Sequence, residues 1–295
     1  MKAAVIGGDK RMLYAAKAFF DSGAEVAIAG FDDLQSLCAM RIMSVNDALK
    51  WADFSVLPIR PLTDGYLSFP CASERITVQQ FVAMNHGKPV FCGSADSIRP
   101  YLDAPVFDYA AREDFAVGNA LLTAEGAIDL LLSRYEDSIF GTPILILGYG
   151  RIGKVLSRYL DALGADVTVA ARKSSDRAWI ESMRYHAVDY SFKELNGYPV
   201  IVNTVPAMIL TADLIDTLSE DVFLVDLASK PGGIDFARIS QRDLSCIHAL
   251  GLPGITAPKA AGRIIKETII RIIKEENGGK ENSGLCPDRL LLHLR

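Results

Sequence analysis

The chain has 295 residues, of which 50% are hydrophobic, so it can bury a sizeable core and is long enough for two domains of ordinary size. Its 31 basic and 36 acidic side chains leave a formal net charge of −5, which argues against nucleic acid or an acidic membrane surface as a partner. The start of the chain runs straight into glycines, with no room for a secretory leader, and no run of about 18 apolar residues is evident. We therefore expect a cytoplasmic protein.

The cysteines and histidines show no metal-binding or disulfide pattern. Five cysteines are scattered without a C-x-x-C pair, and their odd number argues against a disulfide framework. Four histidines lie far apart and never at the i, i+4 spacing that places two ligands on one helix face. We expect reduced thiols and no metal among these residues, which are Cys38, Cys71, Cys92, Cys246, Cys286, His86, His186, His248 and His293.

Short apolar runs alternate with helical or loop segments through the first 108 residues. Their β-branched and aromatic content, with Gly, Pro or Asp at the borders, predicts strands within 2–8, 24–31, 53–59, 88–93 and 104–109. A helix between the first two strands ends at Gly23, with an apolar face of Met12, Ala15, Ala16 and Phe19. This alternation is typical of a parallel sheet covered by helices.

Residues 112–135 form the expected bridge between the two domains. The segment has the pattern of one long helix or of two joined helices. Gly118 and Gly126 each weaken a helix by about 1 kcal/mol relative to Ala. We therefore expect a bend or a close approach of another element at these glycines.

A second alternating series follows and completes the predicted fold. Strands are expected within 142–148, 165–172, 198–205, 221–229 and 244–251, and helices within 151–164, 175–184 and 211–219. A strong helix at 257–275, with an isoleucine stripe, should return to the first domain, and the polar, glycine-rich residues 276–295 should be mobile. The fold class is α/β, with two Rossmann-like parallel-sheet domains (1–118 with 259–295, and 119–258), a bridging helix, a C-terminal return helix and a cleft between the domains.

The sequence ILGYGRIG contains the spacing G-x-G-x-x-G at a strand-to-helix junction. The first glycine permits a sharp turn, the second removes a side chain where a pyrophosphate must approach, and the third lets helix and strand pack closely. Backbone N–H groups at the helix start then meet the anion. We expect a dinucleotide to contact Gly148, Tyr149, Gly150, Arg151, Ile152 and Gly153.

The end of the next strand indicates which dinucleotide binds. NAD-binding units usually carry a carboxylate there for the ribose 2′-hydroxyl, whereas this chain has Arg172, Lys173 and Ser174. A guanidinium can pair with a 2′-phosphate that a carboxylate would repel, so NADP is favoured. NAD stays possible, because these cations could form a solvated strand end or an arginine could lie on adenine.

Two later strand ends should line the nicotinamide side of the same site. We expect Asn203 and Thr204 to supply hydrogen bonds there, and Pro206 to stiffen the turn. The loop after the following strand occupies the equivalent position. The predicted cofactor contacts from these loops are Asn203, Thr204, Val205, Pro206, Asp226 and Ala228.

The N-terminal turn resembles the glycine turn but departs from its spacing. Gly7 and Gly8 are followed by Asp9, whose side chain would crowd and repel a pyrophosphate. Arg11 and the helix start still suit an anionic group such as a carboxylate. We expect the first domain to bind substrate and the second domain to bind cofactor.

Several phrases together carry a family resemblance. They are AVIGGDKR, REDFAVGNALLTAEGAI, ILGYGRIG, VNTVPA, VDLASKPGG and ALGLPGITAPKAAG. From about residue 2 to about residue 275 the chain resembles the family of the dipicolinate synthase A subunit of spore-forming bacteria. The resemblance implies oxidation of dihydrodipicolinate to dipicolinate with NADP, together with a flavoprotein-like second subunit, the B subunit, in the mother-cell cytoplasm. The domain plan is also similar to that of D-2-hydroxyacid dehydrogenases.

The residues that would oxidise an alcohol in D-2-hydroxyacid dehydrogenases are missing. The corresponding neighbourhoods read GLPG at 251–254 and ASKPGG at 228–233, without the expected His or Arg, and His248 lies inside a predicted strand. A pyridine dicarboxylate instead needs cationic partners and a route for one proton. We expect Arg11, Arg60, Glu125 and Lys259 to serve as carboxylate clamps or acid–base groups, with Thr123 as a further candidate. Each of them could also be a solvated surface residue.

Three functions are compatible with these observations. The first is the dipicolinate synthase reaction, and the second is an NADP-dependent dehydrogenase reaction on another small carboxylate. The third is a non-catalytic role in NADP sensing or scaffolding. A homo-oligomer is possible in each case.

Overall fold

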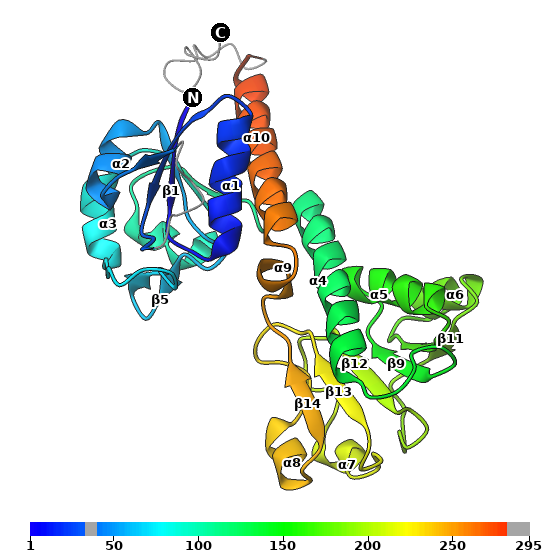
Figure 1. The fold of residues 1–295 in the computed structure, drawn as a ribbon. Helices are drawn as coiled ribbons and strands as arrows, with labels where there is room; N and C mark the ends of the chain where they lie inside the picture. The colour runs from blue at the N-terminus through cyan, green and yellow to red at the C-terminus, as the bar shows by residue number, and fades with distance from the viewer. Residues whose placement is uncertain (33–39, 282–295) are drawn as a thin grey trace. The chain divides into compact units, whose positions relative to one another are not determined.

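The computed structural model describes residues 1–32 and 40–281. The chain divides into two compact units, Met1–Asn119 together with the chain from Ala257 onward, and Ala120–Thr256. Each unit is built on a six-stranded sheet (Figure 1). The predicted reduced cysteines Cys38 and Cys286, and His293, lie outside the described residues.

In the first unit, six parallel strands take the order β3-β2-β1-β4-β7-β8. Alternate residues of β1 enter two different cores, so Ala3 and Val5 pack on one face and Ala4 and Ile6 on the other. The strands are β1 (Lys2–Ile6), β2 (Glu25–Ala29), β3 (Arg41–Ile42), β4 (Phe54–Val56), β7 (Val90–Cys92) and β8 (Val106–Asp108). The helices are α1 (Lys10–Asp21), α2 (Val45–Trp51), α3 (Val78–Asn85), α10 (Pro258–Glu281) and the 3₁₀ turns η1 (Ala95–Ser97) and η2 (Arg99–Tyr101).

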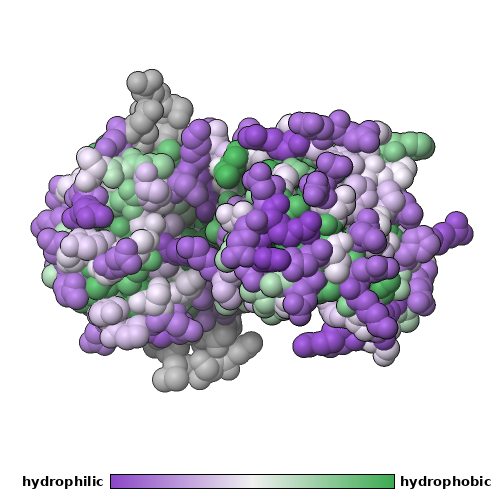
Figure 2. Space-filling model, turned by 90° about the horizontal axis from the view of Figure 1, so that it is seen from below, coloured by the Kyte–Doolittle hydropathy of each residue, from purple (hydrophilic) through white to green (hydrophobic). Residues whose placement is uncertain are grey.

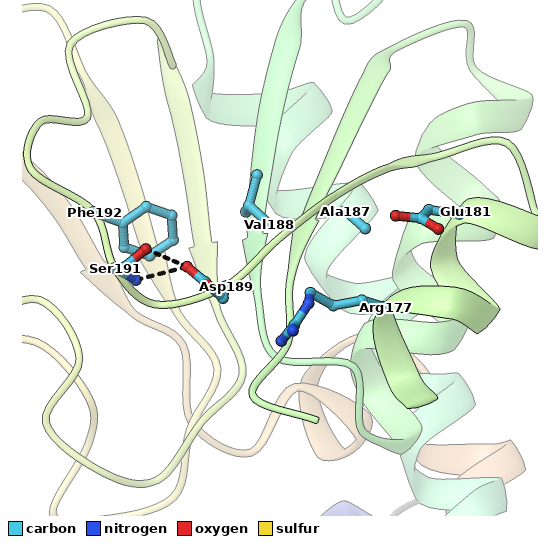
Figure 3. Close-up of a pocket in the computed structure, with 7 residues that line it drawn as sticks. All are labelled: Arg177, Glu181, Ala187, Val188, Asp189, Ser191 and Phe192. Carbon is cyan, nitrogen blue, oxygen red and sulfur yellow. Dashed lines mark hydrogen bonds between the residues drawn. The ribbon is translucent and has the colours of Figure 1, made fainter. Parts of the chain in front are cut away.

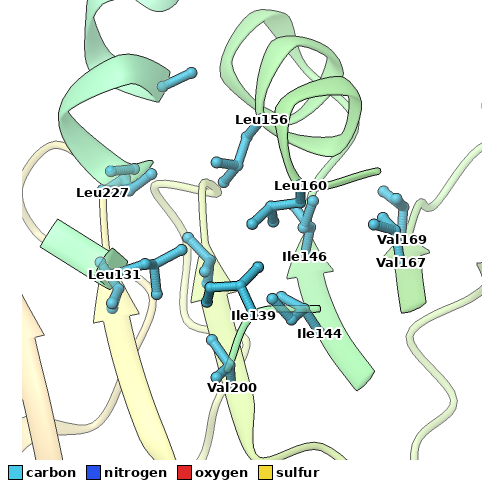
Figure 4. Packing of buried hydrophobic residues seen from close by; sticks show 14 of the residues in the cluster. Leu131, Ile139, Ile144, Ile146, Leu156, Leu160, Val167, Val169, Val200 and Leu227 are labelled. Carbon is cyan, nitrogen blue, oxygen red and sulfur yellow. The ribbon is translucent and has the colours of Figure 1, made fainter. Parts of the chain in front are cut away.

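The second unit repeats this topology with the strand order β11-β10-β9-β12-β13-β14. Ile144 and Ile146 of β9 pack against Leu131 of α4 and Leu156 of α5 (Figure 4). The strands are β9 (Pro143–Leu147), β10 (Asp166–Ala170), β11 (His186–Val188), β12 (Val200–Asn203), β13 (Phe223–Asp226) and β14 (Ser245–His248). The helices are α4 (Glu113–Arg134), α5 (Arg151–Ala162), α6 (Ser174–Ser182), α7 (Ala212–Ile215), α8 (Phe236–Gln241) and α9 (Leu252–Ile255).

The predicted bridge is one continuous helix, α4, whose first residues belong to the first unit and whose remainder belongs to the second. Both of its glycines mark close approaches, as predicted. A Cβ at Gly118 would lie 3.0 Å from Ile264 Cδ1, and one at Gly126 would lie 2.8 Å from Leu252 Cβ. Although α4 is long and apolar enough to cross a membrane, Phe115 packs in a core of the first unit, and Ala124, Ala127 and Leu131 pack in a core of the second. On the face shown in Figure 2, hydrophobic side chains occupy small areas between hydrophilic ones.

Helix α10 packs along α1 within the first unit (Figure 1), in agreement with the predicted return helix. A Cβ at Gly262 would lie 2.5 Å from the backbone nitrogen of Ala15, so the glycine lets the two helix backbones meet. The expected isoleucine stripe is buried against the same core as Met12 and Phe19. Helix α10 continues to Glu281, so it includes the first residues of the segment 276–295, whose mobility stays a prediction.

Several elements were not predicted because they are very short. The edge strands β3 and β11 have two and three residues, too few to show a hydrophobic period. The segment 60–76 contains a short hairpin of β5 (Leu62–Thr63) and β6 (Tyr66–Leu67). The helix expected at 211–219 is confined to Ala212–Ile215.

Tyr109 provides a test of the first core. Its hydroxyl donates to the carbonyl oxygen of Leu57 at 3.0 Å, its side chain is fully buried, and its ring contacts Phe115 of α4. Because Tyr109→Phe removes one buried hydrogen bond, we expect it to lower the unfolding free energy of the first unit by about 1 kcal/mol. Tyr101→Phe, at a half-exposed ring, should have no effect.

Urea unfolding followed by tryptophan fluorescence measures this change. The chain has only two tryptophans, Trp51 in the first unit and Trp179 in the second, so a Trp179→Phe background reports on the first unit alone. Equal unfolding midpoints for Tyr109→Phe and Tyr101→Phe would show that the buried bond contributes nothing.

Candidate functional site

The predicted cofactor residues gather at one edge of the second sheet. They follow β9, β10, β12 and β13, which are parallel neighbours, so their carboxyl ends share that edge. The chain leaves β9 on one side toward β10 and later returns on the other side as β12. In sheets of this topology, ligands bind outside the carboxyl ends at such a switch point.

The three glycines of the turn have different surroundings. A Cβ at Gly148, where φ is +105°, would lie 2.5 Å from Thr204 Oγ1, and one at Gly153 would lie 2.0 Å from the carbonyl oxygen of Gly148. By contrast, nothing lies within 4 Å of the position of a Cβ at Gly150. Gly148 and Gly153 are therefore required by packing within the protein, whereas Gly150 borders open space, as the approach of a pyrophosphate would require.

The start of α5 lacks a side-chain cap. Gly150 is the N-cap residue, and no side chain accepts a hydrogen bond there. Arg151 and Ile152 begin the helix, so the backbone N–H groups of its first turn face the space beside Gly150. Tyr149 is half-buried, with Lys154 Nζ 5.4 Å from the centre of its ring, and burial raises its pKa. The arrangement suits an anionic ligand.

Hydrogen bonds from two side chains fix the backbone at the end of β10, where Arg172 lies. Arg177 Nη1 donates to the carbonyl oxygens of Ala171 and Arg172, at 3.0 Å in each case. Tyr190 Oη donates to the carbonyl oxygen of Ala170 at 3.2 Å. The side chain of Arg172 is exposed and makes no hydrogen bond or ion pair with any described residue. Its guanidinium is therefore available to an incoming phosphate.

A surface pocket of about 420 Å³ opens between α6 and β11. Arg177, whose guanidinium donates to the carbonyl oxygens of Ala171 and Arg172, also lines this pocket (Figure 3). Hydrogen bonds from Ser191 lower the pKa of Asp189 on the opposite wall. The pocket is lined by Arg177, Glu181, Ala187, Val188, Asp189, Ser191 and Phe192.

Asn203 and Asp226 require a correction, because their side chains face the protein and are fully buried. Asn203 Nδ2 donates to Asp226 Oδ1 at 2.8 Å and to the carbonyl oxygen of Val205 at 3.0 Å. Asp226 also accepts from the backbone nitrogens of Ala228 and Gly233. These two residues hold the loops after β12 and β13 in position and leave no polar atom for a ligand.

The rest of these two loops is closer to the surface. Thr204 Oγ1 donates to the carbonyl oxygen of Leu147 at 2.8 Å, which joins the loop to the glycine turn. Thr204 and Val205 are half-buried, and Pro206 is exposed. Ala228 is buried, with its nitrogen directed at Asp226. Of these residues, Thr204, Val205 and Pro206 are placed for ligand contact.

In the first unit, the turn between β1 and α1 carries an ion pair between Asp9 and Arg11. Asp9 caps α1 by accepting from the backbone nitrogen of Arg11 at 3.0 Å. The Arg11 guanidinium binds the same carboxylate, with Nη2 2.7 Å from Oδ2. Burial opposes ionisation of Asp9, but these bonds from Arg11 prevail and lower its pKa. A carboxylate thus stands at the helix start where a phosphate would otherwise bind.

The four predicted catalytic residues differ in availability. The guanidinium of Arg11 is already engaged by Asp9, whereas Arg60 is exposed and has no partner among the described side chains. Glu125 on α4 and Lys259 in the first turn of α10 are exposed. His248 lies in β14, as predicted, with Nε2 3.3 Å from the carbonyl oxygen of Ala228. The catalytic roles of the first four stay predictions.

Two residues of the site were missed at the sequence level. Arg177 was predicted only as part of a helix, although as the fourth residue of α6 it reaches back to the end of β10. Tyr190 follows β11, which was itself not predicted. Their contacts are side chain to backbone, which no spacing rule reveals.

The fold and the site define the class of this protein as an NAD(P)-dependent oxidoreductase with two Rossmann-type domains. The apo structure of D-lactate dehydrogenase from Escherichia coli shares this fold, with a TM-score of 0.57 and 16% identity, covering 99% of this chain and 100% of that one. The family described as the N-terminal domain of the dipicolinate synthase A subunit matches residues 2–105.

Two further comparisons are closer. The dipicolinate synthase A subunit of Bacillus subtilis (strain 168) is 30% identical over 291 residues, which cover 93% of this chain and 96% of that protein. The crystal structure of the dipicolinate synthase A subunit from Bacillus halodurans has a TM-score of 0.83 at 30% identity, with 92% and 97% of the two chains covered. The chain therefore belongs to the family of the dipicolinate synthase A subunit.

The open space at Gly150 gives a direct test of the site. Gly150→Ala adds a methyl group that touches no protein atom but stands where a pyrophosphate would approach, so we expect dinucleotide affinity to fall about tenfold or more. Gly197→Ala is the matched control, since its Cβ also meets nothing within 4 Å and it lies in a loop of the same unit.

Calorimetry with NADPH measures the affinity, and thermal unfolding shows that both variants stay folded. Both should unfold at the wild-type temperature, and only Gly150→Ala should lose affinity. Wild-type affinity in Gly150→Ala would exclude this turn as the phosphate site.

Proposed function

We propose that the chain oxidises dihydrodipicolinate to dipicolinate and transfers the hydride to NADP⁺. The dihydropyridine ring loses one hydride and one proton and becomes aromatic. The observation that carries the proposal is the open glycine turn beside the unpartnered guanidinium of Arg172, in a chain of this family. Aromatisation drives the reaction forward, so positioning matters more than a strong base.

The second unit would hold the cofactor through three groups of residues. The turn Gly148–Gly153 offers backbone N–H groups to the pyrophosphate, and Arg172, Lys173 and Ser174 offer cationic and hydroxyl partners to a 2′-phosphate. Thr204, Val205 and Pro206 would border the nicotinamide, which accepts the hydride when bound. The buried side chains of Asn203 and Asp226 would hold the loop after β12 in position without touching the cofactor.

The first unit would bind the dicarboxylate. Arg60 is the stronger clamp candidate, because it is exposed and its guanidinium is not engaged by another described side chain. Arg11 would have to exchange Asp9 for a substrate carboxylate. Lys259 and Glu125 are the candidates for a second carboxylate contact and for taking the ring proton.

A second polypeptide would complete the enzyme. The relatives from Bacillus subtilis and Bacillus halodurans are described as the A subunit of dipicolinate synthase, a name that implies a partner. We therefore propose a flavoprotein-like B subunit in that role, in the cytoplasm of a sporulating mother cell.

A spectroscopic assay tests the reaction. We expect NADPH to form when dihydrodipicolinate and NADP⁺ are added to this chain, either by itself or with the second subunit. Its formation with another small carboxylate only would favour a different dehydrogenase. Tight NADP binding without turnover under either condition would contradict the proposed reaction and favour a sensing role.

The choice of NADP over NAD depends on Arg172. Because Arg172→Ala removes a charge-assisted bond to the 2′-phosphate, we expect NADPH affinity to fall about tenfold or more while NADH affinity changes less than about twofold. Arg158→Ala, at an exposed arginine of α5, should change neither affinity. Calorimetry with both dinucleotides measures the ratio, and an equal loss for both would remove Arg172 from the 2′-phosphate site.

A further inference from the structure

Residues 61–73 form a strap over the carboxyl ends of β1 and β2 in the first unit. The backbone nitrogen of Gly8 donates to the carbonyl oxygen of Ser68, and that of Asp32 to the carbonyl oxygen of Cys71, both at 2.9 Å. Asp32 Oδ2 accepts from the backbone nitrogen of Ser73 at 2.8 Å. The strap is therefore fastened to its own sheet by bonds from the end of each strand.

Phe69 is the part of the strap that meets the sheet most closely. A Cβ at Gly7, just after β1, would lie 2.2 Å from Phe69 Cδ1, and one at Gly30, just after β2, would lie 3.0 Å from Phe69 Cζ. The ring thus rests on both glycines. It also packs against the apolar core on the α2 and α3 face of the sheet.

The strand order of the first sheet shows which position of a nucleotide-binding fold the Phe69 ring occupies. The first unit has the same strand order as the second, with β1 and β2 in the positions of β9 and β10. In a sheet of this kind, the nucleoside of a dinucleotide lies over the ends of these two strands, and its phosphates lie at the start of the following helix. Phe69 stands at the first place and the Asp9 carboxylate at the second.

We propose that Phe69 and Asp9 are a built-in substitute for a nucleotide, which closes the first unit to dinucleotides and limits each chain to one. The aromatic ring replaces the nucleoside, and the carboxylate at the start of α1 replaces the phosphate. The proposal depends on the proposed function in one respect: the one dinucleotide that each chain binds would lie in the second unit. The claim that Phe69 and Asp9 fill the nucleotide position of the first unit depends only on the contacts of these two residues.

The test adds adenosine to the full chain saturated with NADPH. Adenosine carries no charge, so Asp9 does not repel it. We expect the unaltered chain to bind one NADPH and no adenosine. Phe69→Ala removes the ring above Gly7 and Gly30 and should bind one adenosine per chain, at adenosine concentrations about tenfold or more below the highest at which the unaltered chain still binds none. Phe69→Leu, which keeps most of the bulk, is the matched control.

Equilibrium dialysis gives the stoichiometry, and Trp51 fluorescence reports whether the first unit is folded. Phe69→Val provides a milder truncation if Phe69→Ala does not fold. Two NADPH molecules bound to the unaltered chain would overturn the proposal without any variant. No gain of adenosine in a folded truncation variant would overturn it as well.

The two proposals fail separately. If the unaltered chain binds no NADPH while Phe69→Ala gains adenosine, the proposed cofactor site is wrong and the built-in substitute stands. If NADPH binds once and the folded truncation gains nothing, the substitute is wrong and the cofactor site stands.

Discussion

The contact of α5 with β9 is the constraint on which the cofactor side of the structure depends. At Gly153 the helix approaches the preceding turn so closely that any side chain would overlap the carbonyl oxygen of Gly148. This contact directs the uncapped start of α5 toward the open space at Gly150. Packing thus leaves backbone N–H groups beside open space, and on the proposed function these groups would let a chain with net negative charge receive a pyrophosphate.

The side chains around this turn mostly position other groups. The buried side chains of Asn203 and Asp226 bond to each other and to backbone groups of Val205, Ala228 and Gly233, so they join the two neighbouring loops. Arg177 likewise fixes the end of β10, because it donates to the carbonyl oxygens of Ala171 and Arg172. Residues that would touch a ligand are therefore few, and their placement depends on buried neighbours that would not touch it.

The two units show how one topology can have different uses. Both sheets have the same strand order, yet the second leaves its switch point open at Gly150, whereas the first covers the ends of β1 and β2 with its own strap. The difference arises from local chemistry. Asp9 caps α1 with a carboxylate, whereas Gly150 leaves α5 without a side-chain cap.

The sequence by itself determined the class of fold, the order of the longer strands, the glycine turn and the family, because these depend on local periodicity, turn chemistry and short motifs. Only the tertiary structure decided that Asn203 and Asp226 face each other from neighbouring strands and that Arg11 is bound by Asp9. It also decided that Phe69 lies on Gly7 and Gly30. These contacts join residues whose side chains could equally well face solvent in an isolated segment. Their direction is set by which strand ends become neighbours when the sheet forms, and no local pattern encodes that.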